Sequence, residues 1–135
     1  MHRFINNVLI LVLLIVLLLS GCKKDEGLVY LRDESNFGTF NIENNKVYFY
    51  NNLKIKNYDK EDYSFKIIID ASIEGDLVKG DTLSVYHSDN LDNDIFTIKA
   101  NEEKEFPIVA IGEKGEGQLK KDRLPPEAII IEIVE

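Results

Sequence analysis

The sequence predicts an all-β protein, an antiparallel β-sandwich of about seven or eight strands. Apolar and polar side chains alternate with a period of two along several short segments rich in β-branched and aromatic residues, which is typical of half-buried strands. Glycine, asparagine and aspartate fall between these segments, as tight turns require. No segment after residue 22 has a convincing apolar period of 3.6 residues, so helices are not expected there. A small β-barrel is the main alternative fold.

The first 22 residues form a separate unit. Arg3 supplies a positive charge, residues 8–19 form an unbroken apolar run, and two small residues then precede Cys22, the only cysteine. A positive start, a short apolar core and a small-residue exit are the parts of a secretory signal peptide. As a helix, residues 8–19 would be about 18 Å long, which is short for the ~30 Å hydrocarbon core of a bilayer.

The end of this unit, Leu19-Ser20-Gly21-Cys22, resembles the lipobox of bacterial lipoproteins. The resemblance implies that Cys22 receives a diacylglyceryl group and becomes the first residue of the mature protein once residues 1–21 are removed. Two acyl chains are enough for stable membrane attachment. We therefore expect a lipid-anchored protein of the bacterial cell membrane, with its domain on the extracytoplasmic side. A plain transmembrane anchor with an incidental cysteine is the alternative.

Residues 22–27 are expected to tether the lipid to one β domain, residues 28–135. Lys24-Asp25-Glu26 resembles the surface-export signal of Bacteroidetes-type lipoproteins, although Gram-positive lipoproteins also have charged tethers, so surface exposure stays open. The net charge is −8, and it becomes −9 when Arg3 is removed. This acidic excess argues against a nucleic-acid partner, because binding nucleic acid depends on cationic contacts with phosphates.

Eight segments of the domain are expected to be strands: Leu28–Leu31, Phe37–Ile42, Val47–Lys56, Tyr63–Ile73, Asp81–Tyr86, Ile95–Ala100, Glu105–Ile111 and Ala128–Val134. The clearest alternation places Ile67 and Ile69 on the core side of the fourth segment. Gly80 is expected in a turn, and residues 112–117 in a mobile hairpin loop. Pro125-Pro126 should form a bend before the last strand, because proline cannot donate ladder hydrogen bonds.

The run from Leu53 to Tyr58, followed by a charged turn and Tyr63-Ser64-Phe65, resembles the B and C strands of Ig-like domains in bacterial surface proteins. The resemblance is one of architecture and implies an Ig-like β-sandwich. The cysteine pair and core tryptophan of antibody domains are absent, so no family function follows from the resemblance.

The mature chain offers few groups for catalysis, and no enzyme activity or cofactor is expected. Its one histidine, His87, continues a strand alternation and is expected to be structural or exposed. Asp89, Asp92 and Asp94 supply the oxygen ligands that calcium prefers, and they are the only metal candidates. The pattern departs from an EF-hand, which needs glycine and glutamate where Asp94 and Ala100 stand, and such loops are also ordinary turns.

Tyr48, Tyr50 and Tyr58 are expected to share one side of a strand with Lys54 and Lys56, a combination that could form a partner surface. The alternative is that they cover the sandwich rim or lie under a neighbouring strand. The expected function is a lipid-anchored, non-enzymatic cell-envelope module that binds a protein or an envelope component. Two alternatives stay open: an accessory subunit or inhibitor within a larger envelope complex, and a small hydrolase that uses carboxylates.

Overall fold

The computed structural model describes residues 27–71, 77–118 and 123–135. Cys22, the tether signal at 24–26 and Ile73 lie outside the described residues. The described elements are the strands β1 (Leu28–Tyr30), β2 (Asn36–Glu43), β3 (Lys46–Asn57), β4 (Tyr63–Asp70), β5 (Val78–His87), β6 (Phe96–Ile98), β7 (Glu103–Lys114) and β8 (Ile129–Val134), and the short 3-10 helix η1 (Arg32–Glu34). Within the described ranges, no helix has the length and apolar character needed to cross a membrane.

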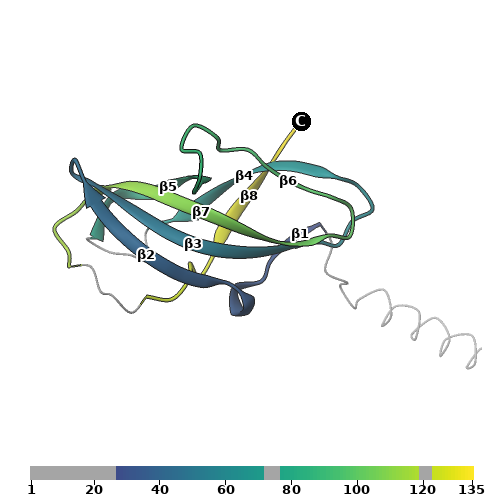
Figure 1. The fold of residues 1–135 in the computed structure, drawn as a ribbon, viewed down its shortest axis with the longest axis horizontal. Coiled ribbons are helices and arrows are strands. Elements are labelled where there is room, and N and C mark those ends of the chain that lie inside the picture. Colours follow the sequence, from purple (N-terminus) through teal and green to yellow (C-terminus); the bar gives the residue numbers. More distant parts are fainter. Residues whose placement is uncertain (1–26, 72–76, 119–122) are drawn as a thin grey trace, which may run out of the picture.

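The eight strands form one antiparallel sheet that curls nearly into a barrel (Figure 1). The order is β1-β3-β7-β5-β4-β6, with β2 also paired to β3 and β8 to β4. β1 and β2 pair with different parts of β3, at 55–57 and 46–52. β5 lies between β7 and β4: Val78, Lys79 and the residues from Ser84 onward pair with β7, whereas Thr82, Leu83 and Ser84 pair with β4. The all-β prediction is confirmed, and this arrangement is consistent with either a sandwich or a small barrel.

The core lies on one side of the long strands β3 and β4, as the alternation predicted. In β3, every odd-numbered residue is buried and every even-numbered residue is half-buried or exposed. Phe65, Ile67 and Ile69 of β4 are buried in the same way. The rings of Phe65, Phe96 and Phe106 contact one another, with centroids 5.6–5.9 Å apart, and so join β4, β6 and β7.

Two glycines expected in turns lie within strands, so those predictions were wrong. Gly80 is part of β5, at an irregularity in the pairing with β7, and its φ of +90° is one that side chains rarely adopt. Gly112 is part of β7 and pairs with Val47. A Cβ at Gly112 would clash with Leu83 Cδ2, so glycine permits close packing here. The loop begins only after Lys114, and it does not connect a hairpin, because β7 pairs with β3 and β5 whereas β8 pairs with β4.

Other boundaries also differ from the predictions. β4 ends at Asp70, and Ala71 donates its N–H to the Asp81 carbonyl at 2.7 Å instead of continuing the strand. β6 is shorter than expected because the residues that flank it bond to loops: the Ile95 carbonyl contacts His87, and the Ala100 N–H donates to Asp62. Pro125 and Pro126 lie outside the strands, before β8, as predicted.

Candidate functional site

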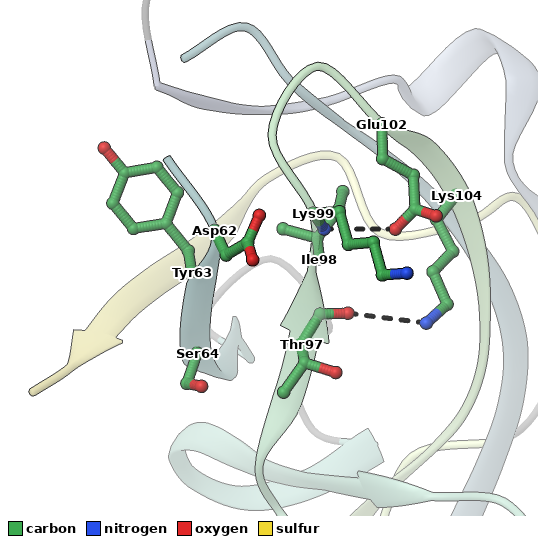
Figure 2. A pocket seen from close by; sticks show the side chains of 8 residues that line it. All are labelled: Asp62, Tyr63, Ser64, Thr97, Ile98, Lys99, Glu102 and Lys104. Atoms are coloured by element: carbon green, nitrogen blue, oxygen red, sulfur yellow. Dashed lines mark hydrogen bonds between the residues drawn. The ribbon is translucent and has the colours of Figure 1, made fainter. Parts of the chain in front are cut away.

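A polar groove of about 520 Å³ lies beside the start of β4 and the β6–β7 turn (Figure 2). It forms because the ladder is incomplete there: β6 pairs with β4, whereas β5 pairs with β7 only from Ile108 onward. Eight residues line the groove: Asp62, Tyr63, Ser64, Thr97, Ile98, Lys99, Glu102 and Lys104.

Hydrogen bonds give the charged side chains of the groove different roles. Asp62 Oδ1 accepts from the Ala100 N–H at 2.8 Å, and Glu102 Oε1 accepts from the Lys99 N–H at 3.1 Å. Both carboxylates therefore stabilise the β6–β7 turn. Lys104 Nζ donates to the Thr97 carbonyl at 3.4 Å, a long bond that a ligand could replace (Figure 2).

Tyr63 and Asp59 join the groove to the point where the chain enters the domain. The Tyr63 hydroxyl donates to Asp59 Oδ2 at 2.5 Å, and the Gly27 N–H donates to Asp59 Oδ1 at 3.0 Å. The bond from Tyr63 and then the bond from Gly27 lower the pKa of Asp59 below 3.8. The bond to Asp59 is also the main cause that raises the pKa of Tyr63 to about 12.

These pKa shifts give the pair a defined pH range. The lowered pKa of Asp59 means that its contribution to stability is present above the unfolded value and is lost as the pH falls through the folded value. The raised pKa of Tyr63 means that its contribution is present below pH 10 and is lost as the pH rises toward about 12. At neutral pH the phenol is protonated, so it can donate hydrogen bonds and cannot act as a base.

Asn57 links the turns at this end of the domain through buried hydrogen bonds. Its side chain is fully buried, and its Nδ2 donates to the carbonyls of Glu61 at 2.7 Å and Lys99 at 3.0 Å. Its Oδ1 accepts from the Asp59 N–H at 2.9 Å. One side chain therefore joins the end of β3 to the turn before β4 and to the turn before β7.

The three aspartates proposed as calcium ligands lie in the loop between β5 and β6. Asp94 Oδ2 lies 3.5 Å from Lys66 Nζ. The oxygens that organise the loop belong instead to Asn90 and Asn93, whose Oδ1 atoms accept from the backbone N–H groups of Asp92 and Ile95, both at 3.1 Å. The described residues contain no group of three or more His, Cys, Asp or Glu side chains that could hold a metal ion. Calcium binding therefore stays an alternative to the ordinary turn expected from the sequence.

His87 lies at the end of β5 and has two contacts. Its Nε2 is 2.7 Å from the Ile95 carbonyl oxygen, and its ring stacks on Phe96 with centroids 4.1 Å apart. The ring therefore connects the loop after β5 to the core.

A second, smaller cavity lies where residues 123–126 cross the sheet. Its volume is about 20 Å³, which is enough for one water molecule, and its lining includes Phe37, Phe49 and Asn51. Asn51 is 6% exposed, and its Oδ1 has no hydrogen-bond partner among the described residues. Pro126 is held there because its carbonyl accepts from the Tyr30 hydroxyl at 2.7 Å.

The tyrosine-rich side of β3 faces away from the core. Tyr48 and Tyr50 are half-buried on it, whereas Tyr58 follows the end of β3 and lies under Lys56 Nζ, 4.8 Å from its ring centroid. Lys54 Nζ lies 3.3 Å from Glu34 and 3.4 Å from Glu103. The predicted grouping therefore holds for Tyr48 and Tyr50, and Tyr58 lies beyond the strand.

Sequence reasoning did not identify the groove. Its residues come from the turn before β4, from β4 and β6, and from the β6–β7 turn and the start of β7. No motif links them, and only the strand pairing brings them together. Comparison with known protein families, with curated proteins and with solved structures finds no match to this chain.

Proposed function

We propose that the protein is a lipid-anchored, non-enzymatic module of the bacterial cell envelope that binds a protein or an envelope component in the groove. The observation that carries this proposal is the division of roles among the charged groups. Asp62 and Glu102 each accept a backbone N–H through one carboxylate oxygen, whereas the ammonium groups of Lys99 and Lys104 and the hydroxyls of Ser64 and Thr97 are donors among the groove-lining residues. Such donors favour a partner with carboxylate, phosphate or carbonyl oxygens.

The position of the groove supports a partner near the membrane. The Gly27 N–H bonds to Asp59, which in turn bonds to Tyr63 in the groove lining. The five residues between Cys22 and the first strand can span at most roughly 18 Å when extended. A lipid on Cys22 would therefore hold the groove within a short distance of the membrane surface.

The anchor is tested by replacing Cys22 with serine. Because the thiol is the acyl acceptor, Cys22→Ser should abolish lipid labelling and leave an uncut precursor. The measurement is metabolic lipid labelling with intact-mass spectrometry of the membrane fraction. An unmodified Cys22 in the wild-type membrane fraction would sink the anchor proposal.

The binding site is tested by crosslinking in intact envelopes with the native lipidated protein. Lys104→Ala should remove the partner-dependent crosslink, because it deletes one of the two ammonium groups in the groove. Lys60→Ala is the matched control, since Lys60 is exposed in the turn before β4 and does not line the groove. If both variants capture the same partner as wild type, the groove is not the binding site.

A further inference from the structure

We propose that the outward side of β3 and β7 is the interface of a symmetric dimer of this chain, with a twofold axis parallel to the two strands. This surface, here called the β3–β7 face, consists of the even-numbered side chains of β3 and the odd-numbered side chains of β7. The core side chains of β7 are Phe106, Ile108 and Ala110, so the odd-numbered ones point outward. The axis follows from the order of charges on this face and from where the chain enters the domain.

The centre of the β3–β7 face is apolar. Tyr48 lies opposite Ile111, and Tyr50 lies opposite Val109. The two tyrosines and Ile111 are half-buried, whereas Val109 is fully buried although it is on the outward side. Val109 is therefore already covered within one copy, and the accessible part of this centre is made by the two tyrosines and Ile111. An aromatic and aliphatic centre on the solvent side of a sheet is typical of an interaction surface.

Charged pairs lie at both ends of this apolar centre. Lys46 lies opposite Glu113 at one end, and at the other end Lys54 lies opposite Glu105 and Lys56 lies opposite Glu103. Every lysine is on β3 and every glutamate is on β7. Within the described part of the chain, Lys46, Glu105 and Glu113 form no ion pair, so these groups are available to a second copy.

A twofold axis parallel to the strands makes this face complementary to itself. Rotation about that axis places β3 of one copy over β7 of the other without reversing their ends, so each side chain meets the type of residue that it already pairs with. Each lysine then faces a glutamate of the second copy, Tyr48 faces Ile111, and Tyr50 faces the residues that cover Val109. Opposite charges around an apolar centre are the arrangement that favours association.

An axis perpendicular to the strands gives the opposite result. The pair of Asn51 and Ile108 is the midpoint of the ladder between β3 and β7. A twofold axis that passes over this midpoint, in the plane of the sheet and perpendicular to the strands, would place Lys46 over Lys56 of the second copy and Glu103 over Glu113. Because like charges that face each other disfavour association, the charge order selects the parallel axis.

The chain entry selects the same axis. Gly27 lies at the Asn57 end of β3, because its carbonyl accepts from the Tyr58 N–H at 2.9 Å. The parallel axis keeps both copies of Gly27 at one end, where both tethers reach a single membrane, and the perpendicular axis would send them to opposite ends. The choice of end rests on the proposed lipid anchor, whereas the charge order does not. Two copies confined to one membrane also have a high effective concentration.

The face is large enough for a specific interface of small size. The ladder from Lys46 to Lys56 is roughly 34 Å long, and β2 and β5 flank it only along residues 46–52 and 108–114, so the face covers about 500 Å² from standard strand dimensions. Two copies would bury roughly 1,000 Å² together, which is the lower limit for a specific interface.

The first test uses a crosslink in the membrane. Tyr50→Cys places a thiol near the axis, and a bismaleimide of about 10 Å matches the usual spacing of packed sheets. With Cys22 lipidated, the new thiol is the only free one. Lys60→Cys is the matched control, because Lys60 is exposed in the turn before β4 and lies outside both the face and the groove. We expect a dimer-sized product with Tyr50→Cys and at least tenfold less with Lys60→Cys.

The second test exchanges the charges in the crosslinkable protein. Lys46→Glu or Glu113→Lys alone should lower the dimer yield at limiting protein density about tenfold, because each variant creates two like-charge contacts by symmetry. The double variant should restore the yield to within about threefold of wild type. Lys60→Glu, which makes the same charge change away from the face, should have no effect. Melting curves identify any variant that fails to fold, and the double variant then decides the outcome.

Three results would overturn the dimer. These are equal crosslinking of Tyr50→Cys and Lys60→Cys, no rescue by the double variant, and a Tyr50→Cys crosslink to a different protein. A crosslink in the parent protein with no introduced cysteine would instead reveal a free Cys22 and count against the lipid anchor. The charge exchange can then be repeated in a Cys22→Ser background, which removes that thiol, so failure of the anchor and failure of the dimer are distinguishable.

Discussion

Ile67→Ala should lower the free energy of unfolding by about 2–5 kcal/mol, which is a large part of the 5–15 kcal/mol typical of a domain of this size. Ile67 is 2% exposed in the middle of β4, and it lies opposite Ile131 of β8. Truncation removes apolar contacts and leaves a cavity that the sheet on either side cannot easily fill. Denaturant unfolding of the wild type and the variant measures the difference, provided that the free energy of unfolding depends equally on denaturant concentration in both proteins.

The neighbouring residue supplies the matched control. Lys66 points outward, its side chain is 44% exposed, and its ion pair with Asp94 is a surface contact. Lys66→Ala should therefore change stability by only about 0.5 kcal/mol. Ile68, the one apolar residue on the outward side of β4, is half-buried between Ser84 and Ile130, and Ile68→Ala should fall between the other two. Equal losses for Ile67→Ala and Lys66→Ala would contradict this register.

Asn57→Ala should destabilise the protein by about 3 kcal/mol, because it removes three hydrogen bonds worth roughly 1 kcal/mol each. The loss is concentrated at one end of the domain, where the side chain joins the carbonyls of Glu61 and Lys99 to the N–H of Asp59. Chemical denaturation measures the change in stability. Hydrogen exchange at the Asp59 amide should accelerate, since that amide loses its acceptor.

Asn51 is the control for Asn57, because both are buried asparagines on the core side of β3. The Oδ1 of Asn51 has no partner among the described residues. Replacing it with leucine, which has a similar shape, removes an unpaired polar atom and should be nearly neutral or stabilising. A large loss for Asn51→Leu together with a small one for Asn57→Ala would show that hydrogen bonding does not explain these two positions.

The strands were predictable from the sequence where one side faces the core and the other faces outward. The alternation around Phe65, Ile67 and Ile69 is the same in the sequence and in the structure. Prediction failed where glycines interrupt the alternation. Glycine is typical of turns, so the sequence predicted turns at Gly80 and Gly112. In the structure Gly80 lies at an irregularity in the pairing of β5 with β7, and Gly112 allows close packing against Leu83. Both roles depend on the pairing of strands in the folded sheet.

The groove and the β3–β7 face illustrate what a single sequence does not determine. Lys104 Nζ lies 3.4 Å from the Thr97 carbonyl oxygen because β4 pairs with β6 and β3 pairs with β7. Neither pairing follows from the alternation alone. The tyrosines on β3 were visible in the sequence. The opposing Glu103, Glu105 and Glu113 became meaningful only when the register between the two strands was known.

The placement of β1 beside the end of β3 has a mechanical consequence. Leu28, Val29 and Tyr30 run directly inward from Gly27 and pair with residues 57, 56 and 55. A pull at Gly27 directed along β1 would load the hydrogen bonds of this short ladder together rather than one after another. Flow or drag on a domain held by its N-terminus would be resisted in shear, the stronger direction, before the force reached the core strands.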